Sequence, residues 1–167
     1  LAHRIHYPPD PGDTIRSFHQ IRYLSRTHAV HLACLIDDKR DLRHLDAIGE
    51  FCKSISTVFR SRSVARLRAL GAVPGKGPLS VAAFHSKSLQ EKVRAVVRTQ
   101  KLDVILGFSS AMAAYVQEFS SIPKVMDFVD VDSEKWRAYA GYHRPPASWI
   151  YRLEAGRLAR YEESILR

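Results

Sequence analysis

The chain has 167 residues, 46% of them apolar and 26% charged, and carries a formal net charge of +9. These values fit one soluble globular domain with a substantial core, and they exclude a disordered or fibrous chain. No apolar run approaches the length of a transmembrane helix, and the start of the chain does not resemble a signal peptide. The positive charge favours an acidic partner, which can be nucleic acid, an anionic membrane surface or a phosphorylated ligand.

Strand and helix patterns alternate through the first part of the chain. The predicted elements are, in order, the end of a strand at Leu1–Ile5, a proline-rich loop at 7–12, a helix from Asp13 or Thr14 to Leu24, a strand at His28–Ile36, a helix at about 41–52 and a strand at Ser54–Phe59. This βαβαβ order predicts right-handed crossovers and a parallel sheet. Since the chain starts at Leu1 with barely half a strand, we expect it to be a fragment of a longer protein.

The second part of the chain continues the alternation and then becomes helical. The predicted elements are, in order, a short basic helix at Ser63–Leu70, a loop at Gly71–Pro78, a helix at about 88–99, a strand at Leu102–Phe108, a helix from Ser109 or Ser110 to Phe119, a strand from Lys124, and helices at about Asp132–Tyr142 and Ala147–Leu166. Glu154 falls in the middle of the apolar face of the last helix. The predicted fold is a single α/β domain with a Rossmann-like, doubly wound, mostly parallel sheet.

Two cysteines, Cys34 and Cys52, lie among apolar neighbours in a predicted strand and a predicted helix. Neither belongs to a metal-ligand pattern or to a C-x-x-C motif. We therefore expect both to be reduced core residues of a cytoplasmic protein.

Aspartates crowd the end of the strand that starts at Lys124, in the stretch K-V-M-D-F-V-D-V-D-S-E-K-W. Asp127 lies inside the strand and needs a polar partner if it is buried. Asp130 and Asp132 follow the strand, where parallel sheets keep their ligand sites. The structural alternative is that Asp132 or Ser133 caps the next helix and that Asp130 accepts hydrogen bonds from loop amides.

Two further stretches are candidate binding loops. Gly12, just before a helix that starts at Asp13, lets backbone amides approach a phosphate at the positive end of the helix. Gly107 and Ser109 end a strand that neighbours the first one in the common doubly wound order, so Gly12, Arg16, Gly107 and Ser109 would face one cavity. The alternatives are a tight proline-rich turn with Asp13 as a cap, and a plain helix cap at Ser109.

Other catalytic signatures are missing from the sequence. None of the eight histidines has metal-site spacing, so we expect no metal site, although His3 and His19 can approach the predicted crevice. There is no G-x-S-x-G elbow and no catalytic cysteine signature, which disfavours an acyl-transfer enzyme.

Basic and aromatic residues mix in two regions of the sequence. Arg60, Arg62, Arg66 and Arg68 surround the third strand and the next helix, and a second group comprises Tyr142, His143, Trp149, Arg152, Arg157 and Arg160. Such a mixture suits an anionic membrane surface, and it is also typical of a solvated helix face.

The order of motifs resembles the N-terminal half of family 4 glycosyltransferases of the GT-B fold. The opening A-H-R, P-P-D-P-G-D and I-R-S-F-H-Q-I-R-Y-L-S carries the resemblance to the family. The stretches D-V-I-L-G-F-S-S-A-M-A, V-M-D-F-V-D-V-D-S-E-K-W and R-L-E-A-G-R-L-A-R-Y-E resemble the sugar transferases associated with exosortase and exopolysaccharide gene clusters of bacteria.

The resemblance implies an acceptor-side domain, residues 1–167, of a retaining, metal-independent transferase with no cofactor and a nucleotide-diphosphate sugar as donor. Gly12 corresponds to the loop glycine near the donor phosphate, and Asp130 lies near the position of a catalytic or sugar-contacting side chain, where many relatives have a histidine. The remaining expected substrate-binding residues are Asp13, Arg16, Gly107, Ser109 and Asp132. The C-terminal nucleotide-sugar domain is absent from this sequence, so we expect the isolated chain to be inactive.

The resemblance also implies a lipid-linked or glycan acceptor and a cytoplasmic protein, peripheral on the inner face of the cell membrane. The alternative function is a non-catalytic flavodoxin-like domain that binds nucleic acid or another anionic partner through its arginines. No helix-turn-helix, RRM or KH signature supports nucleic-acid binding. A dehydrogenase or epimerase lacks support because the three-glycine fingerprint is missing.

Overall fold

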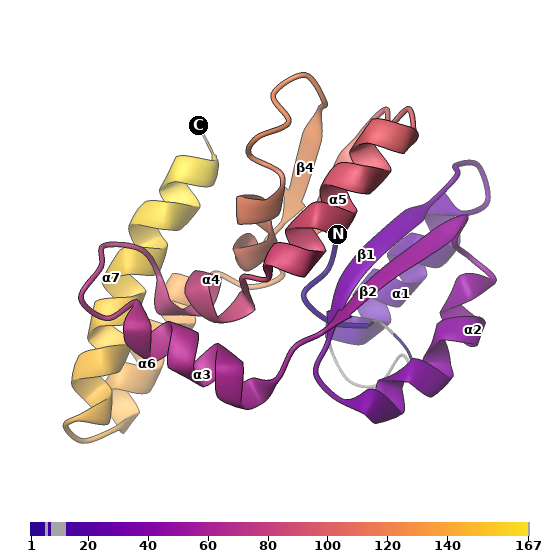
Figure 1. Ribbon diagram of the computed structural model, residues 1–167. Coiled ribbons are helices and arrows are strands. Elements are labelled where there is room, and N and C mark those ends of the chain that lie inside the picture. Colours follow the sequence, from indigo (N-terminus) through magenta and orange to yellow (C-terminus); the bar gives the residue numbers. More distant parts are fainter. Residues whose placement is uncertain (6, 8–12, 167) are drawn as a thin grey trace.

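A computed structural model describes residues 1–5, 7 and 13–166 (Figure 1). The elements are, in chain order, α1 (Asp13–Leu24), β1 (His31–Ile36), the 3-10 helix η1 (Lys39–His44), α2 (Leu45–Gly49), β2 (Ser54–Phe59), α3 (Arg62–Gly71), α4 (Leu79–Phe84), α5 (Lys87–Thr99), β3 (Ile105–Phe108), the 3-10 helix η2 (Ser110–Tyr115), β4 (Lys124–Asp127), α6 (Asp132–Tyr142) and α7 (Ala147–Ile165). The predicted α/β class is confirmed.

The strands form two parallel pairs. β1 pairs with β2 from His31 opposite Ser54, and β3 pairs with β4 from Ile105 opposite Lys124. Between the pairs, Ala2 makes parallel bridges to Cys34 of β1 and to Phe108 of β3. The strand predicted at Leu1–Ile5 is therefore present only as this one bridging residue, and the predicted parallel pairing is confirmed.

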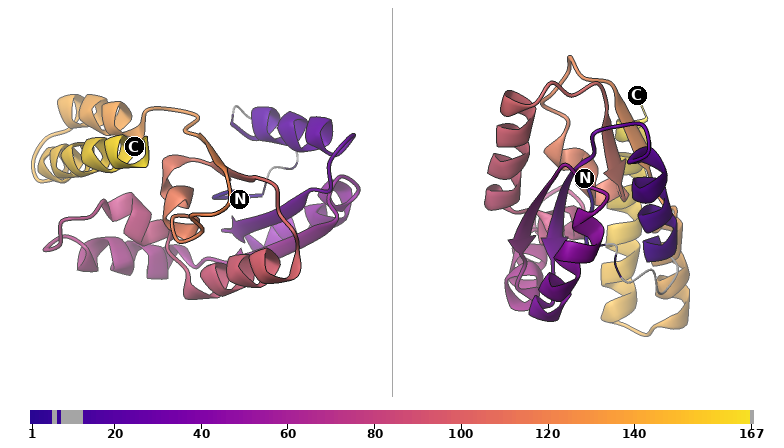
Figure 2. Two further views of the ribbon diagram at one scale, coloured as in Figure 1. Left: turned by 90° about the horizontal axis from the view of Figure 1, so that it is seen from above. Right: turned by 90° about the vertical axis from the view of Figure 1, so that its right-hand side faces the viewer.

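Apolar side chains cover both faces of β1, which explains why nearly the whole strand is apolar. Ala33 and Leu35 join a core cluster with α5 and η2, whereas Leu32 and Cys34 join a second cluster with Ile21 of α1 and residues of α2. Figure 2 shows α1 and α5 on opposite sides of the strands. Side chains of a strand alternate between its faces, so both helical layers depend on this strand.

The cysteines lie where the sequence predicts apolar surroundings. Both are free, Cys34 is fully buried and Cys52 is half-buried. Burial raises the pKa of the Cys34 thiol to about 12 and that of Cys52 to about 11. Both thiols are thus poor nucleophiles at neutral pH.

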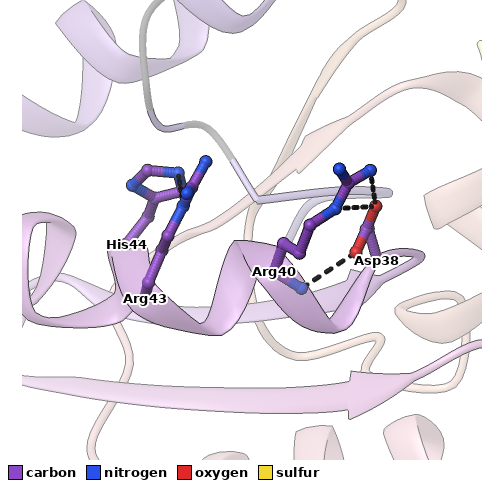
Figure 3. Close-up of polar contacts among 4 residues, drawn as sticks. All are labelled: Asp38, Arg40, Arg43 and His44. Carbon is purple, nitrogen blue, oxygen red and sulfur yellow. Dashed lines mark hydrogen bonds and ion pairs between the residues drawn. The ribbon is translucent and has the colours of Figure 1, made fainter.

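The region after β1 differs from the predicted single helix at about 41–52. Asp38 starts η1 by accepting a hydrogen bond from the backbone nitrogen of Arg40 (2.9 Å) and two from its guanidinium, at 2.9 and 2.6 Å (Figure 3). Hydrogen bonds from the Arg40 side chain lower the pKa of Asp38 to about 2. A tight 3-10 turn follows this local cap, and the α-helix begins only at Leu45.

Other boundaries also shift. η2 replaces the helix predicted from Ser109 or Ser110 to Phe119, and β3 is shorter than the strand predicted from Leu102. The six-residue helix α4 has no counterpart among the predicted elements. Its hydrophobic pattern is too short to distinguish a helix from a loop.

Helix α7 holds three other helices by their ends through buried charged side chains. Glu154 accepts hydrogen bonds from the backbone nitrogens of Leu79 (2.6 Å) and Ser80 (2.8 Å) and from the Ser80 hydroxyl (2.6 Å), at the start of α4. Two turns later, Glu162 accepts from the nitrogen (3.2 Å) and hydroxyl (2.6 Å) of Ser133, at the start of α6. These carboxylates supply the caps that the first turns of both helices require.

The third contact from α7 is made by a cation, and it is made at the C-terminal end of a helix. Arg157 is buried and donates to the carbonyl oxygens of Ala72 (3.1 Å), Val73 (2.7 Å) and Gly77 (3.3 Å), just after α3. A cation at the negative end of a helix is stabilising. The last helix therefore fixes α3, α4 and α6 relative to one another.

We expect Glu154→Gln to lower the free energy of unfolding by about 2 to 3 kcal/mol. The glutamine replaces one carboxylate oxygen with an amide nitrogen, which cannot accept the hydrogen bonds that Leu79 and Ser80 donate. Urea unfolding followed by circular dichroism measures the change. The matched control is Glu91→Gln on the exposed face of α5, which should change the free energy by less than about 0.5 kcal/mol. Equal stabilities of the two variants would contradict the role of Glu154.

Candidate functional site

A cavity of about 580 Å³ opens beside the carboxyl ends of β3 and β4, and we call it the strand-end cavity. Its lining comes from the segment after Ala2, from α1, α4 and α6, and from the residues that follow β3 and β4. The lining residues are His3, Arg4, Arg16, Ser80, Phe84, Ser109, Ala111, Phe128, Val129, Asp130, Asp132, Lys135 and Trp136. It thus lies on the edge of the sheet where parallel folds bind ligands.

Four of the residues predicted to form a site meet in this cavity: Arg16, Ser109, Asp130 and Asp132. Gly107 does not line it, which contradicts the expectation that Gly107 faces the same cavity. It lies buried in β3, and a methyl group in place of its hydrogen would come within 2.4 Å of the Met126 sulfur. Gly107 therefore serves the close packing of β3 against β4.

The other two predicted binding residues lie at the start of α1. Asp13 is the first residue of that helix, and Gly12 lies outside the described residues. Of the two histidines expected near the crevice, His3 lines the cavity and His19 does not.

Asp127, at the end of β4, has the partners that a carboxylate inside a strand needs. Its Oδ2 lies 2.8 Å from Nη2 of Arg16 and accepts a hydrogen bond from Nε2 of Gln20 at 2.9 Å. Its Oδ1 accepts from the backbone nitrogen of Val129 at 3.0 Å. This network ties α1 to the loop after β4, and it commits the charge of Arg16 to Asp127.

Two lining residues have positive φ angles although they are not glycine. Ser109 has φ 83° and ψ 139°, and its nitrogen donates to the Asp127 carbonyl at 2.8 Å. Val129 has φ 67° at the centre of a three-residue turn in which the Asp130 nitrogen donates to the Phe128 carbonyl at 2.8 Å. Such conformations cost about 1 to 3 kcal/mol each and often occur at functional sites.

Asp130 and Asp132 line the same cavity in different surroundings. Asp130 is exposed, and within the described part of the chain its carboxylate has no hydrogen-bond or ion-pair partner. Asp132 is half-buried, and its Oδ2 accepts a hydrogen bond from the Ser110 hydroxyl at 3.4 Å. Burial raises the pKa of Asp132, the Glu162 and Asp130 charges raise it further, and Lys135 opposes them.

The sequence offered the alternative that Asp132 or Ser133 caps the next helix, and the structure does not show such a cap. The position before α6 is Val131, which provides no side-chain cap, and Ser133 donates its backbone nitrogen to Glu162. The start of α6 is therefore capped from α7. The carboxylate of Asp132 remains directed to the cavity side of the helix, against Ser110.

The cavity also holds cations and aromatic rings. Lys135 is exposed, and no described residue forms an ion pair with it. Arg4 donates from Nε to Nε2 of His3 at 2.9 Å, and the His3 ring lies parallel to Phe108 with centroids 6.2 Å apart. The cavity can therefore contact an anionic group through Lys135 and an apolar or ring-shaped group through its aromatic lining.

Sequence reasoning did not select Lys135 and Trp136 as site residues, although a signal was present. They follow Asp132 by three and four positions in a predicted helix, and that spacing brings all three side chains to one face. Ser80 and Phe84 carried no such signal, because α4 reaches the cavity only through tertiary contacts. Glu154 holds the start of α4, and at its end the Tyr115 hydroxyl donates to the Phe84 carbonyl at 2.6 Å and accepts from the Ser86 nitrogen at 2.7 Å.

Comparison of the chain with protein-family models, curated proteins and solved structures finds no match. The family resemblance carried by the sequence motifs therefore stays a prediction. Among the residues that the structure describes, no three His, Cys, Asp or Glu side chains group as metal ligands. Across the same residues, no helix has both the length and the apolar character needed to cross a membrane.

We expect Ser109→Gly to raise the free energy of unfolding by about 1 kcal/mol, because glycine adopts this φ without the steric cost that serine bears. Chemical denaturation checks the change. Ser110→Gly is the control, since Ser110 is buried in η2 and contacts Asp132, and it should be destabilising. A loss of stability in Ser109→Gly equal to that of the control would show that Ser109 is not strained.

We expect Asp132→Asn to stabilise the protein at pH 7 and to have little effect near pH 4. A carboxyl group with a raised folded pKa binds its proton more tightly in the folded state, so its ionisation above that pKa lowers stability. The asparagine removes this penalty, and the gain disappears as the wild-type carboxyl becomes protonated at low pH. Urea unfolding of both proteins at the two pH values measures it.

The exposed Asp103→Asn variant, which lies outside the cavity, serves as the control for this pH dependence and should change stability little at either pH. A stability difference for Asp132→Asn that is the same at pH 4 and pH 7 would contradict the prediction.

Proposed function

We propose that this chain is the acceptor-side domain of a retaining, metal-independent glycosyltransferase of the GT-B type, acting on a lipid-linked or polysaccharide acceptor in exopolysaccharide biosynthesis. The donor is a nucleotide-diphosphate sugar, and the site of action is the cytoplasmic face of the membrane. The observation that carries the proposal is the gathering of Arg16, Ser109, Asp130 and Asp132 in one cavity at the strand ends. Sequence motifs of the resembled family supply all four residues.

The strand arrangement supports the finer fold assignment, a doubly wound Rossmann-like sheet. The bridges of Ala2 to β1 and β3 give the spatial order β2, β1, Ala2, β3, β4. The chain thus builds outward from a central segment first to one side and then to the other. Doubly wound folds bind their ligands where the strand order reverses in this way, and the strand-end cavity adjoins that position.

The two carboxylates of the cavity suit the recognition of sugar hydroxyls. Asp130 is exposed and has free acceptor positions, so it can accept a hydrogen bond from an acceptor hydroxyl and orient that oxygen toward the donor sugar. Asp132, held by Ser110, contributes a second acceptor on the same wall. The aromatic side chain of Trp136 offers a flat apolar surface beside them.

Glycosyl transfer leaves negative charge on the departing phosphate, and cations or backbone amides must stabilise it when no metal does so. Lys135 lines the cavity and no described residue forms an ion pair with it, whereas Arg16 is already paired with Asp127. Gly12, the expected loop glycine near the donor phosphate, remains part of the proposal. Most phosphate contacts belong to the nucleotide-sugar domain that the family resemblance implies.

The alternative, a domain that binds nucleic acid or another anionic partner through its arginines, loses two of the residues it relies on. Arg60 forms a two-pronged ion pair with Asp37, at 2.7 and 2.5 Å, and lies over the ring of Phe84. Arg157 is buried against the loop after α3. Internal contacts therefore occupy both guanidinium groups.

The test is sugar transfer by the full-length gene product, with a panel of nucleotide-sugars as donors, membrane extract as acceptor and EDTA present. We expect transfer to survive chelation and Asp130→Asn to lower kcat/KM for the acceptor by about 10- to 100-fold, the value of a hydrogen bond to a charged group. Binding of the donor should change little, because the substitution lies on the acceptor side.

The matched control is Asp103→Asn, an exposed aspartate before β3 at the opposite edge of the sheet, which should leave transfer unchanged. Absence of transfer with every donor would overturn the proposed function. Equal activity of the two variants would overturn the role given to Asp130.

A further inference from the structure

A second cavity, of about 600 Å³, opens beside the carboxyl ends of β1 and β2, and we call it the arginine cavity. The charged residues that line it are four arginines and three aspartates: Arg4, Arg60, Arg62, Arg66, Asp37, Asp38 and Asp41. Arg4 also lines the strand-end cavity, so the two cavities adjoin at the segment that follows Ala2. The arginine cavity therefore lies on the same ligand-binding edge of the parallel sheet.

One wall of the arginine cavity is a face of α3. Its residues follow one another at spacings of three and four positions, which places them on one side of a helix: Arg62, Ala65, Arg66 and Ala69. Arg62 and Arg66 are exposed, and neither forms a hydrogen bond or an ion pair with a residue that the structure describes. Because both guanidinium groups line the same cavity one helical turn apart, a single ligand can contact both.

Two of the three carboxylates on the opposite wall are already paired with other arginines. Asp37 accepts hydrogen bonds from Nε and Nη2 of Arg60, at 2.7 and 2.5 Å. Asp38 accepts from Nε and Nη2 of Arg40, at 2.9 and 2.6 Å (Figure 3). These hydrogen bonds are the main cause of the lowered pKa of Asp38, and the charge of Arg62 contributes least to it. Neither carboxylate therefore neutralises the α3 arginines.

Asp41 is the remaining carboxylate of this wall. It lies in η1 and is half-buried, and within the described part of the chain nothing donates a hydrogen bond to its carboxylate. An ionised carboxylate accepts hydrogen bonds and donates none. The arginine cavity thus combines two cations on one wall with a hydrogen-bond acceptor on the other.

We propose that the arginine cavity binds a phosphorylated polyhydroxy compound, with its phosphate between Arg62 and Arg66 and a hydroxyl group donating to Asp41. A guanidinium group forms two parallel, charge-assisted hydrogen bonds with phosphate oxygens, and a phosphate has enough oxygens for two such groups. A carboxylate has two oxygens, which one guanidinium group already occupies. A ligand without hydroxyl groups would leave the anion facing Asp41 with no hydrogen bond to offset the repulsion.

This site goes beyond the proposed transfer reaction. It uses none of the four residues that gather in the strand-end cavity, and ligand binding requires no sugar donor. Failure of phosphate binding would therefore leave the transferase proposal intact, and absence of sugar transfer would leave this one intact.

The experiment is isothermal titration of the intact protein with inorganic phosphate, glucose 6-phosphate, glycerol 3-phosphate and glucose. We expect at least one phosphorylated polyol to bind more tightly than inorganic phosphate, glucose not to bind, and the affinities for the anions to fall as salt is raised. Arg62→Gln with Arg66→Gln should raise the Kd of every anion at least tenfold, because hydrogen bonds to charged groups are lost.

Asp41→Ala separates recognition of the hydroxyl groups from recognition of the phosphate. The wild-type Kd of inorganic phosphate, divided by that of the tighter phosphorylated polyol, measures the contribution of the hydroxyl groups. Asp41→Ala should lower this ratio about tenfold, because it removes the hydroxyl acceptor and also relieves repulsion of bare phosphate. A substitution that only disturbed the fold would weaken both ligands alike.

Two control variants carry the same kind of charge change outside the arginine cavity. Arg22→Gln with Arg26→Gln removes two exposed cations at the end of α1 and just after it, and Lys135→Gln removes the exposed lysine of the strand-end cavity. Both should change every Kd less than twofold. All variants should keep the circular dichroism spectrum of the wild type, because the substituted residues are exposed or half-buried.

A phosphorylated polyol can be a soluble compound or the headgroup of a lipid. Cosedimentation with vesicles of phosphatidylcholine, with and without phosphatidylinositol, distinguishes the two sources. Binding that requires phosphatidylinositol and is lost in Arg62→Gln with Arg66→Gln would support the site and assign the phosphate to a lipid. Tight binding of the soluble compounds alone would support the site and assign a soluble ligand.

Three results would overturn the proposal. The first is the absence of phosphate binding by the wild type, and the second is a phosphorylated polyol affinity no greater than that of inorganic phosphate. The third is a loss of affinity in either control variant that equals the loss in Arg62→Gln with Arg66→Gln. For Lys135→Gln, that result would place the anion in the strand-end cavity.

Discussion

The arrangement of the helices depends on two buried carboxylates on one helix. Glu154 and Glu162 lie eight residues apart on α7, and each accepts backbone hydrogen bonds at the start of another helix. A carboxylate is buried at acceptable cost only when hydrogen bonds satisfy it, and the first turn of a helix offers free donors and a favourable dipole. The buried carboxylate and the backbone N–H groups at the start of the helix thus offset each other's cost of leaving water. Arg157 makes the complementary contact with the carbonyl groups after α3.

These contacts decide the walls of the strand-end cavity. Two helices contribute side chains to these walls: α4 carries Ser80 and Phe84, and α6 carries Asp132, Lys135 and Trp136. Contacts with α7, and not the pairing of strands, fix the position of both helices. On the opposite wall, Asp127 fixes the loop after β4 through Arg16 and the nitrogen of Val129. The cavity is therefore held by charged hydrogen bonds on every side, while the apolar clusters lie on the two faces of the sheet.

The arginines that give the chain its positive charge have different structural roles. Arg16, Arg60 and Arg157 satisfy internal acceptors, so they contribute to the fold and to the geometry of the cavity. Arg62 and Arg66 of α3 stay exposed, line a second cavity together with Asp37, Asp38 and Asp41, and form no ion pair with a described residue. Net charge alone could not separate these two groups, because the distinction rests on which acceptors tertiary folding brings near each guanidinium.

The sequence by itself determined the α/β class, the bounds of β2 and α6, and the position of Ser109, Asp130 and Asp132 just after strand ends, because the strands of a parallel sheet end at one shared edge. Tertiary structure alone decided the role of Glu154, which the sequence marks only as a charge on an apolar face, and the internal packing role of Gly107. It also decided that Ile15 of α1 and the apolar side chains of Leu67 and Leu70 of α3 are exposed. Periodicity reports which residues share a face, but it does not report what lies opposite that face, and the partners of these residues come from segments distant in the chain.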